Sequence, residues 1–471
     1  MSVAFLLEAE ANTVTVPELR FGMTVETREA GLAVIAIDDD APVGNKLRPR
    51  DVIVSYRLLG ALSRPIPVYS NDQLEDVKKL LNADKPVEIT VLRPNADDDK
   101  NPGYDQIVVA LRPADLRETK TVAYSVQVAR ADPPPPEKDP THTLVDVYYG
   151  TDRALEKGQY TGTMDQTDSP VKLGFCRVSV PKDRRPGELP RPSWWPTEWR
   201  EDPAKHLILT TVSQFDGESS FFEALSASLL KAEGKRRALV YVHGYNNDFE
   251  EAALRTAQLH YDLGFPGISC FFSWPSDGTF RGYKADEEDI QVATPHIRDF
   301  IAALENRPDI DEIFVLAHSM GNRGVTTALK ELVSNGGGKK IRELILAAPD
   351  INATVFNKQI APDLAKHIPR ITIYASNRDR PLAASQWIGG YARAGEMGSD
   401  GLPFVTPLRN LDVCDASIAD SDFWGHSVYG DSPTVLNDLW ELIVTSKNAD
   451  GRRMLSPVNS SSGRFYRLKT R

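Results

Sequence analysis

The stretch that decides the fold is Ile313-Phe314-Val315-Leu316-Ala317-His318-Ser319-Met320-Gly321-Asn322. Its four leading apolar residues predict a short buried strand. Apolar residues at helical spacing follow, and Asn335-Gly336 predicts where that helix ends. The apolar positions are Val325, Ala328, Leu329, Leu332 and Val333. The segment is therefore predicted to run strand, serine turn, helix.

Ser319 is the candidate nucleophile of this segment. A serine on so sharp a turn between strand and helix needs small residues two positions before and after it, because the two backbones nearly touch. Gly321 meets this requirement, and Ala317 adds only a methyl group. The amino end of the following helix would also stabilise negative charge that develops beside Ser319. The pattern predicts a nucleophile elbow.

Further apolar runs extend this pattern in both directions along the chain. They are Ala238–Val242, Ile268–Phe272, Leu344–Ala348, Ile371–Tyr374 and Leu411–Val413. Helical stretches separate most of them, which predicts an α/β fold with a mostly parallel sheet and helices on both faces. Three earlier runs are expected to form an antiparallel side of that sheet. They are Val145–Tyr149, Phe175–Val180 and Leu207–Val212.

An activated serine needs N–H groups that stabilise the oxyanion. One is expected from Met320, the residue after the nucleophile, and the other from the loop after an earlier strand. The strand Leu239–Val242 runs into His243-Gly244-Tyr245-Asn246. The glycine lets the backbone approach, so Tyr245 or Asn246 is the expected second donor. His243 is expected to have a structural role.

The base follows by elimination among the eight histidines. In α/β hydrolases the chain order is serine, acid, histidine. Six histidines precede Ser319, and His367 lies before a strand, at the wrong end of the sheet. His426, beyond the Leu411–Val413 run, is the remaining candidate.

The acid has two main candidates, each just past the carboxyl end of a predicted strand. Asp379 follows the Ile371–Tyr374 run, and Asp350 follows Leu344–Ala348. The later strand is the commoner position, so Asp379 is favoured. Asp415, Asp420 and Asp422, near His426 in the sequence, are weaker alternatives.

Seven blocks, in order, resemble an α/β-hydrolase family of the esterase/lipase superfamily that carries a domain-of-unknown-function label. They are Val147–Arg153, His243–Asn247, Phe272–Ser276, Ala317–Asn322, Ala347–Asp350, Tyr374–Ser376 and Gly425–Ser427. The resemblance implies Ser319 as nucleophile, Asp379 as acid, His426 as base, and no cofactor or metal. It implies a serine hydrolase, most simply a carboxylesterase acting through an acyl-enzyme on an ester or amide substrate. The alternatives are a peptidase or amidase with the same triad, and a scaffold without catalysis.

Four consecutive prolines, Pro133–Pro136, predict an extended spacer. We therefore expect an N-terminal domain with its following strand over residues 1–130, a linker over 131–141 and the hydrolase domain over 142–471. The N-terminal part alternates with period two in several runs, and Ser70-Asn71-Asp72 begins a predicted helix.

The N-terminal runs resemble a PDZ domain of the bacterial type. The matching stretches are Phe21–Val25, Gly31–Val34, Ala41-Pro42 and Leu47–Ile53, with the helix from Ser70 in place of the groove helix. In that family a peptide C-terminus adds as a strand beside the groove helix. The resemblance implies that backbone N–H groups of Arg20, Phe21, Gly22 and Met23 bind the peptide carboxylate, so a protein C-terminus is the expected partner.

Charge and composition narrow the remaining partners. The 471 residues carry a net charge of −11, which disfavours nucleic acid as a partner. No apolar run is long enough to span a membrane, and Met1–Glu8 lacks the basic start of a secretory signal. Three widely spaced cysteines form neither a disulfide framework nor a zinc pattern. A cytoplasmic location is the simplest expectation.

Overall fold

The computed structural model divides the chain into two compact units, residues 1–123 and 124–471. The residues that it describes fall in many ranges. They are 15–19, 23–28, 31–37, 47–48, 51–58, 66–68, 74, 77, 87–94, 104–111, 117–121, 126–129, 141–167, 171–187, 189–190, 202–230, 234–245, 247–276, 283–377, 391–417, 433–460 and 463–469.

The N-terminal unit contains a small antiparallel sheet in the order β2-β3-β4-β6-β7, with β5 paired to β4. The strands are β2 (Met23–Arg28), β3 (Gly31–Ile37), β4 (Val52–Leu58), β5 (Ile66–Pro67), β6 (Val87–Pro94) and β7 (Tyr104–Leu111). Leu74 and Val77 are helical and buried, within the helix predicted from Ser70. A separate antiparallel pair is formed by β1 (Thr15–Leu19) and β8 (Arg117–Thr121).

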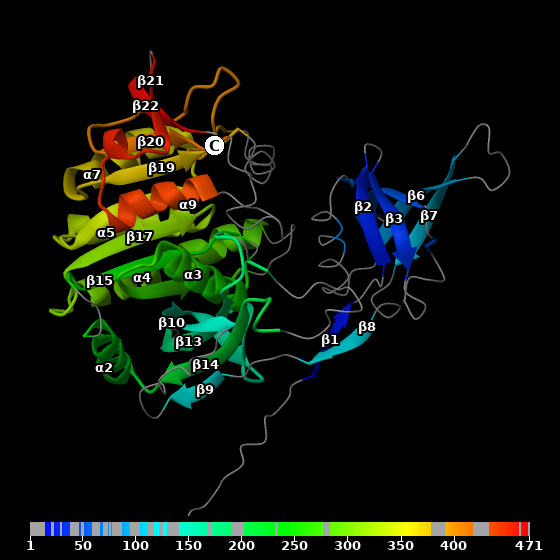
Figure 1. The fold of residues 1–471 in the computed structure, drawn as a ribbon, viewed down its shortest axis with the longest axis horizontal. Helices are drawn as coiled ribbons and strands as arrows, with labels where there is room; N and C mark the ends of the chain where they lie inside the picture. Colours follow the sequence, from blue (N-terminus) through cyan, green and yellow to red (C-terminus); the bar gives the residue numbers. More distant parts are fainter. Residues whose placement is uncertain are drawn as a thin grey trace, which may run out of the picture. The chain divides into compact units, whose positions relative to one another are not determined.

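The second unit is built on a twelve-stranded sheet, in the order β21-β22-β20-β19-β18-β17-β15-β16-β10-β13-β14-β9 (Figure 1). Its first strands in the chain are β9 (Val126–Ala129), β10 (His142–Thr151), β13 (Lys172–Pro181) and β14 (Ile208–Phe215). The central strands are β15 (Arg237–Val242), β16 (Gly267–Ser273), β17 (Glu312–His318), β18 (Ile341–Ala347), β19 (Ile371–Ala375) and β20 (Leu411–Asp415). A hairpin of β21 (Leu455–Ser460) and β22 (Gly463–Leu468) follows. All six central strands lie where the apolar runs predict them.

The central strands are parallel, and the earlier strands form an antiparallel side of the same sheet, both as predicted. Within that side, β13 pairs antiparallel with both of its neighbours, β10 and β14. β10 pairs parallel with β16, and β14 is antiparallel to β13, so it follows the direction of β10.

Helices cover both faces of the sheet and separate the core into two layers. One face carries α2 (Glu218–Leu229), α4 (Tyr283–Glu305), α5 (Gly321–Ser334) and α7 (Ala361–His367). The other carries α3 (Phe249–Leu263), α9 (Pro433–Leu439) and η4 (Trp440–Val444). In β15, Val240 faces the first layer and Tyr241 the second, as the two-residue period of a strand requires.

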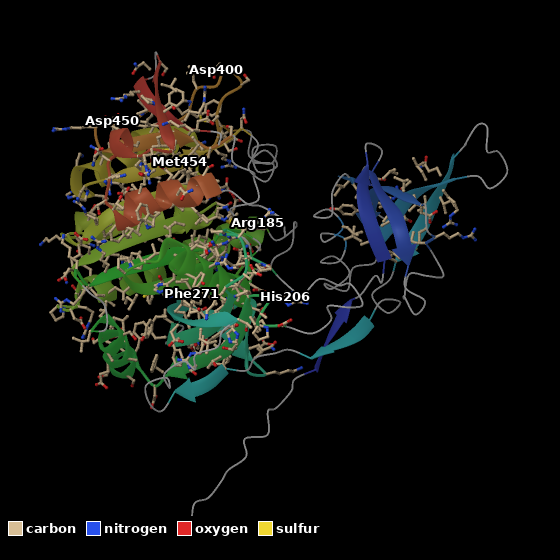
Figure 2. All side chains as sticks on the ribbon, viewed as in Figure 1. Arg185, His206, Phe271, Asp400, Asp450 and Met454 are labelled. Carbon is tan, nitrogen blue, oxygen red and sulfur yellow. The ribbon has the colours of Figure 1, made fainter. Side chains whose placement is uncertain are left out.

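Side chains fill both layers in Figure 2, in which Phe271 lies in the interior. Asp450 lies at the outer end of the sheet, paired with Arg464 of the C-terminal hairpin. Among the described helices, none combines the length and apolar composition needed to cross a membrane.

The strand at 126–129 lies in a different unit from the one that we expected. We expect it with the N-terminal domain, whereas β9 pairs parallel with β14 at the edge of the large sheet. The proline-rich stretch 131–140 therefore joins β9 to β10 inside the second unit. The alternating pattern predicts the strand correctly, but strand pairing across some eighty residues leaves no trace in that pattern.

Candidate active site

Ser319 lies on a strained turn between the end of β17 and the start of α5. Its φ is 47°, in the left-handed region that residues other than glycine rarely occupy. Ser319 and Met320 alone separate His318, the last strand residue, from Gly321, the first helical one. This is the predicted strand–serine–helix geometry, and strain of this kind is typical of functional positions.

Two glycines allow the backbone to pack closely around Ser319. A Cβ atom on Gly321 would lie 2.2 Å from the carbonyl oxygen of His243, a contact between backbones that no rotamer change relieves. A Cβ atom on Gly244 would lie 2.9 Å from the Cβ of Ser319. The loop after β15 therefore lies directly against the serine turn, where the sequence analysis places the oxyanion loop.

Hydrogen bonds from neighbouring segments hold the strained turn in place. The Ser319 N–H donates to the Ala347 carbonyl at 3.0 Å, and the Ser319 carbonyl accepts from the N–H of Asp350 at 3.2 Å. The buried side-chain amide of Asn322 donates to the same two carbonyls, those of Ser319 at 2.9 Å and Ala347 at 3.1 Å. No role for Asn322 is predicted from the sequence. Its place in the Ala317–Asn322 block is the one feature of the sequence that points to it.

Of the three expected oxyanion donors, the structure describes Met320 and Tyr245, while Asn246 lies outside the described residues. Within the described part of the chain, no backbone carbonyl accepts from the Met320 N–H. Tyr245 follows Gly244 immediately, so its N–H belongs to the segment that contacts Ser319. Both remain candidate donors.

The far end of this loop is fixed by the start of α3. The Asp248 side chain accepts from the Glu251 N–H at 2.7 Å, and the Glu251 side chain accepts from the Asp248 N–H at 2.9 Å. This reciprocal cap begins the helix sharply. The loop between β15 and α3 is therefore short and anchored at both ends.

His243 is fully buried and has the structural role expected of it. Its ring stacks on Trp274, with ring centroids 5.1 Å apart, and the indole N–H of Trp274 donates to the His243 carbonyl at 2.9 Å. Burial, followed by the nearby charge of Arg153, lowers the pKa of His243 to about 3. Trp274 itself is fully buried, so this stacked pair supports the loop that follows β15.

Asp350, the alternative acid, is buried between two arginines. Its carboxylate lies 3.2 Å from Arg323 Nη2 and 3.2 Å from Arg393 Nε. Arg323 also donates to the Asp350 carbonyl oxygen at 2.6 Å. Asp415, one of the weaker alternatives, pairs with Arg467 at 2.8 Å. Both carboxylates thus have partners that account for their burial.

Several predicted site residues lie outside the described residues. They are Asp379, His426, Asp420, Asp422, Asn246, Arg20, Phe21 and Gly22. Of the expected peptide-binding loop, Met23 is described as the first residue of β2. The sequence-based assignments at these positions stay predictions.

Comparison with known proteins is consistent with the fold. Residues 218–445, from the start of α2 to the residue after η4, match a family model described as an alpha/beta hydrolase of unknown function (DUF900). The curated protein alr1448 of Nostoc sp. (strain PCC 7120), described as uncharacterized, is 28% identical over 145 residues, which cover 25% of this chain and 36% of that protein. The chain thus spans little more than a third of that relative's length.

Two solved structures are also similar. An inhibited esterase B from Lactobacillus rhamnosis shares 10% identity, over 56% of this chain and 78% of that one, with a TM-score of 0.23. The PDZ domain of a carboxy-terminal protease from Vibrio cholerae shares 12% identity, over 23% of this chain and all of that one, with a TM-score of 0.16. Because both TM-scores are low, the fold assignment rests on the sheet, the serine turn and the family match. The second unit has the α/β-hydrolase fold.

Proposed function

We propose that the second unit is a serine hydrolase that cleaves carboxylic esters, with Ser319 as nucleophile, Asp379 as acid and His426 as base. The observation that carries the proposal is the left-handed conformation of Ser319 on a strand-to-helix turn, with the Gly244 backbone packed against it. Such a turn presents a serine hydroxyl next to backbone N–H groups, which is the arrangement that acyl transfer requires. The assignments of Asp379 and His426 rest on their order in the sequence.

In this proposal the reaction proceeds in two halves. His426 accepts the Ser319 hydroxyl proton as the oxygen attacks the ester carbonyl carbon, and the carbonyl oxygen becomes an oxyanion. The N–H of Met320 and that of Tyr245 or Asn246 donate to it. His426 then returns the proton to the leaving alcohol, which leaves Ser319 acylated. Water repeats the sequence and releases the acid, while Asp379 stabilises the protonated His426.

Asp379 is favoured over Asp350 for a physical reason as well as by position. A catalytic carboxylate must be available to the Nδ1–H of the histidine. Asp350 already lies between Arg323 and Arg393, so using it as the acid would require breaking a buried ion pair. This supports the sequence-based choice.

Turnover of a panel of short-chain and long-chain nitrophenyl esters, with matched amides, tests the proposal. Ser319→Ala and His426→Ala should each lower kcat by about 10⁴-fold or more. Asp379→Asn should lower kcat by about 10⁴-fold, and Asp350→Asn should act on stability instead. A larger loss of kcat in folded Asp350→Asn than in Asp379→Asn would make Asp350 the acid. Faster cleavage of amides than of matched esters would make the protein an amidase.

For the N-terminal unit we propose peptide recruitment. β2 is an edge strand of the small sheet, so its outer side is open to strand addition within the described sheet order. Binding of peptides with free C-termini, measured by fluorescence polarisation against the same peptides with amidated ends, tests this. Equal affinity for both forms, or no binding, would indicate that the unit does not recognise a carboxylate.

A further inference from the structure

A single buried guanidinium contacts the residues on either side of the expected second oxyanion donors. Arg153 begins β11 (Arg153–Glu156) and is 1% exposed. Its Nη2 donates to the Asn247 carbonyl at 2.8 Å and lies 3.5 Å from Nε2 of His243. Tyr245 and Asn246 lie between these two contacts in the sequence.

The same guanidinium ties this loop to other segments near the carboxyl ends of the strands. Nε donates to the Ser273 hydroxyl at 2.8 Å, at the end of β16. Nη1 donates to the Thr161 carbonyl at 3.0 Å, in β12 (Gln159–Met164), and to the Ser276 carbonyl at 3.4 Å. The planar fork of arginine can satisfy so many acceptors at once in one fixed geometry, which lysine cannot do.

These contacts determine the hydrogen-bonding state of His243. Nδ1 of His243 lies 2.8 Å from the Gly244 carbonyl oxygen, which can only accept, so Nδ1 carries the proton. Nε2 is then the acceptor that faces Arg153 and the Ser273 hydroxyl, the latter at 3.3 Å. The positive charge of Arg153 opposes protonation of Nε2, which keeps the ring neutral.

The Gly244 carbonyl matters because of the geometry of the peptide bond. The carbonyl of Gly244 and the N–H of Tyr245 belong to one planar trans peptide unit and point in opposite directions. A hydrogen bond that fixes this carbonyl therefore also fixes the direction of the Tyr245 N–H. The chain of contacts runs from Arg153 through His243 to a candidate oxyanion donor.

We propose that Arg153 is a positioning residue of the oxyanion hole, which holds the loop 243–247 so that the Tyr245 N–H is oriented before substrate binds. This rests on the proposed function. A preorganised donor costs no reorganisation when negative charge develops, so its loss should lower kcat more than it raises KM. A purely structural arginine would instead affect the amount of folded protein.

The test uses the full chain and compares Arg153→Met and Arg153→Lys with Arg177→Met. Arg177 is also buried, and its guanidinium pairs with Asp146 of β10 at 2.7 Å. We expect kcat to fall roughly 100-fold in Arg153→Met and at least about 10-fold in Arg153→Lys, with KM within about three-fold of the parent. Arg177→Met should keep kcat within about three-fold.

Histidine-labelled NMR gives a readout that does not depend on turnover. In the parent, His243 should show one neutral tautomer, protonated at Nδ1, at pH 6. In Arg153→Met that signature should be lost, or the ring should protonate at a higher pH, while Arg177→Met should preserve it.

Two results would overturn the inference. One is a folded Arg153→Met or Arg153→Lys variant with the kcat of Arg177→Met, and the other is a loss of kcat with an unchanged His243 signature. If Arg153→Met does not fold, Arg153→Lys alone decides by the same criteria. Absence of turnover that depends on Ser319 in the parent would instead refute the proposed function, and the inference would fall with it.

Discussion

At the scale of single residues, the serine turn depends on two glycines, Gly321 and Gly244, which have no Cβ atom. A Cβ atom on Gly321 would meet the His243 carbonyl oxygen, and one on Gly244 would meet the His318 ring and the Ser319 Cβ. The requirement for a small residue two positions after the serine could be predicted from the sequence, because it follows from the turn. The clamp by Asn322 and the contacts of Arg153 could not, since each joins segments whose proximity exists only in the folded chain.

Gly321→Ala should destabilise the protein by roughly 2–4 kcal/mol, because the added Cβ meets the His243 carbonyl at 2.2 Å and backbone must move. Gly324→Ala, in the same helix, is the matched control. Its added Cβ meets the flexible ends of Ile290 and Ile297, which can shift. Urea unfolding measures both, and equal costs would contradict the close approach at Gly321.

His260, a partly buried histidine in the last turn of α3, gives a prediction for acid stability. Burial lowers the pKa of His260 to about 4, and its Nδ1 lies 3.0 Å from the Ser269 hydroxyl near the start of β16. The unfolded chain takes up this proton near pH 6.5, whereas the folded chain resists it until about pH 4. The neutral His260 ring therefore makes its full contribution to the free energy of unfolding above pH 6.5, and this contribution is lost as the pH falls toward 4.

His260→Gln should reduce that loss. Between pH 7 and pH 4, the free energy of unfolding of the variant should fall by about 2–3 kcal/mol less than that of the parent. His142→Gln, which removes an imidazole from the start of β10, is the matched control. Parallel pH profiles for the parent and His260→Gln would refute the assignment.

At the scale of elements, the sheet brings the serine turn and the oxyanion loop together because β15 and β17 are parallel neighbours. Val242 pairs with Ala317, so both strands end at the same edge of the sheet. The apolar runs predict which residues form these strands, and the α/β-hydrolase fold implies that they lie side by side in the sheet. The sheet to which β9 belongs could not be predicted, because the pattern of a single strand is the same in either unit.

The placement of β9 predicts which unit responds to a change within it. Val126 is half-buried, pairs with Val212 and packs against the core of the second unit. Val126→Asp should lower the unfolding free energy of the second unit by roughly 1–2 kcal/mol, because apolar burial is lost and a charge is placed at the edge of the core.

Hydrogen exchange at the amides of β14 locates the effect of Val126→Asp. These amides should exchange faster in the variant, and those of β4 and β6 in the N-terminal unit should be unchanged. Faster exchange in the N-terminal unit alone would support the boundary that the sequence analysis expects.

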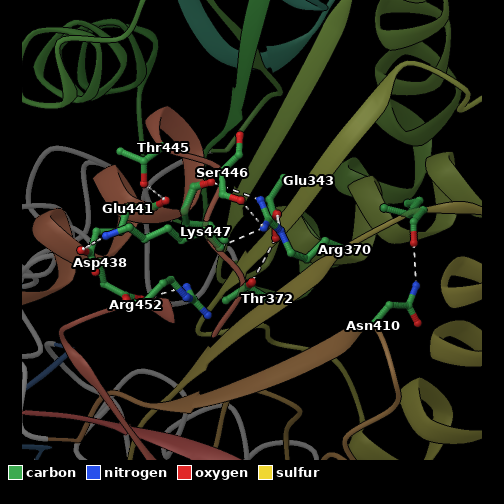
Figure 3. Close-up of polar contacts among 12 residues, drawn as sticks. Glu343, Arg370, Thr372, Asn410, Asp438, Glu441, Thr445, Ser446, Lys447 and Arg452 are labelled. Atoms are coloured by element: carbon green, nitrogen blue, oxygen red, sulfur yellow. Dashed lines mark hydrogen bonds and ion pairs between the residues drawn. The ribbon is translucent and has the colours of Figure 1, made fainter. Parts of the chain in front are cut away.

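At the scale of the whole second unit, a buried polar network stabilises the sheet away from the serine turn (Figure 3). Glu343, near the start of β18, is fully buried and pairs with Arg370, which also donates to the Lys447 carbonyl at 2.9 Å. Thr372 donates to the same carboxylate at 3.0 Å. Burial raises the pKa of Glu343 to about 7, and Arg370 opposes this rise. The network ties two strands to the segment after η4.

Arg370→Met should therefore cost about 3–5 kcal/mol, because it leaves the Glu343 carboxylate buried without its cation. The cost should be larger at pH 8 than at pH 5, since protonation of Glu343 relieves it. Adding Glu343→Gln should recover part of the loss. Chemical unfolding at both pH values measures this, and kcat per folded molecule should not change. A pH-independent cost would contradict the account.

The division into two units could be predicted from composition, but its exact place could not. The proline run is the most visible break in the sequence, yet it joins two strands of one sheet. A run of prolines predicts an extended segment, but it does not indicate whether the strands on either side of it belong to the same sheet. The acid and base stay predictions from chain order for a related reason, since their proximity to Ser319 depends on loops that follow β19 and β20.

The central claim is that Ser319 is an activated nucleophile. Its most direct test is labelling of the full chain with a fluorophosphonate probe, followed by mass spectrometry of the peptide that carries residue 319. The account predicts one adduct on Ser319, abolished in Ser319→Ala and strongly reduced in His426→Ala. A folded protein that stays unlabelled, or one labelled equally in Ser319→Ala, would contradict it.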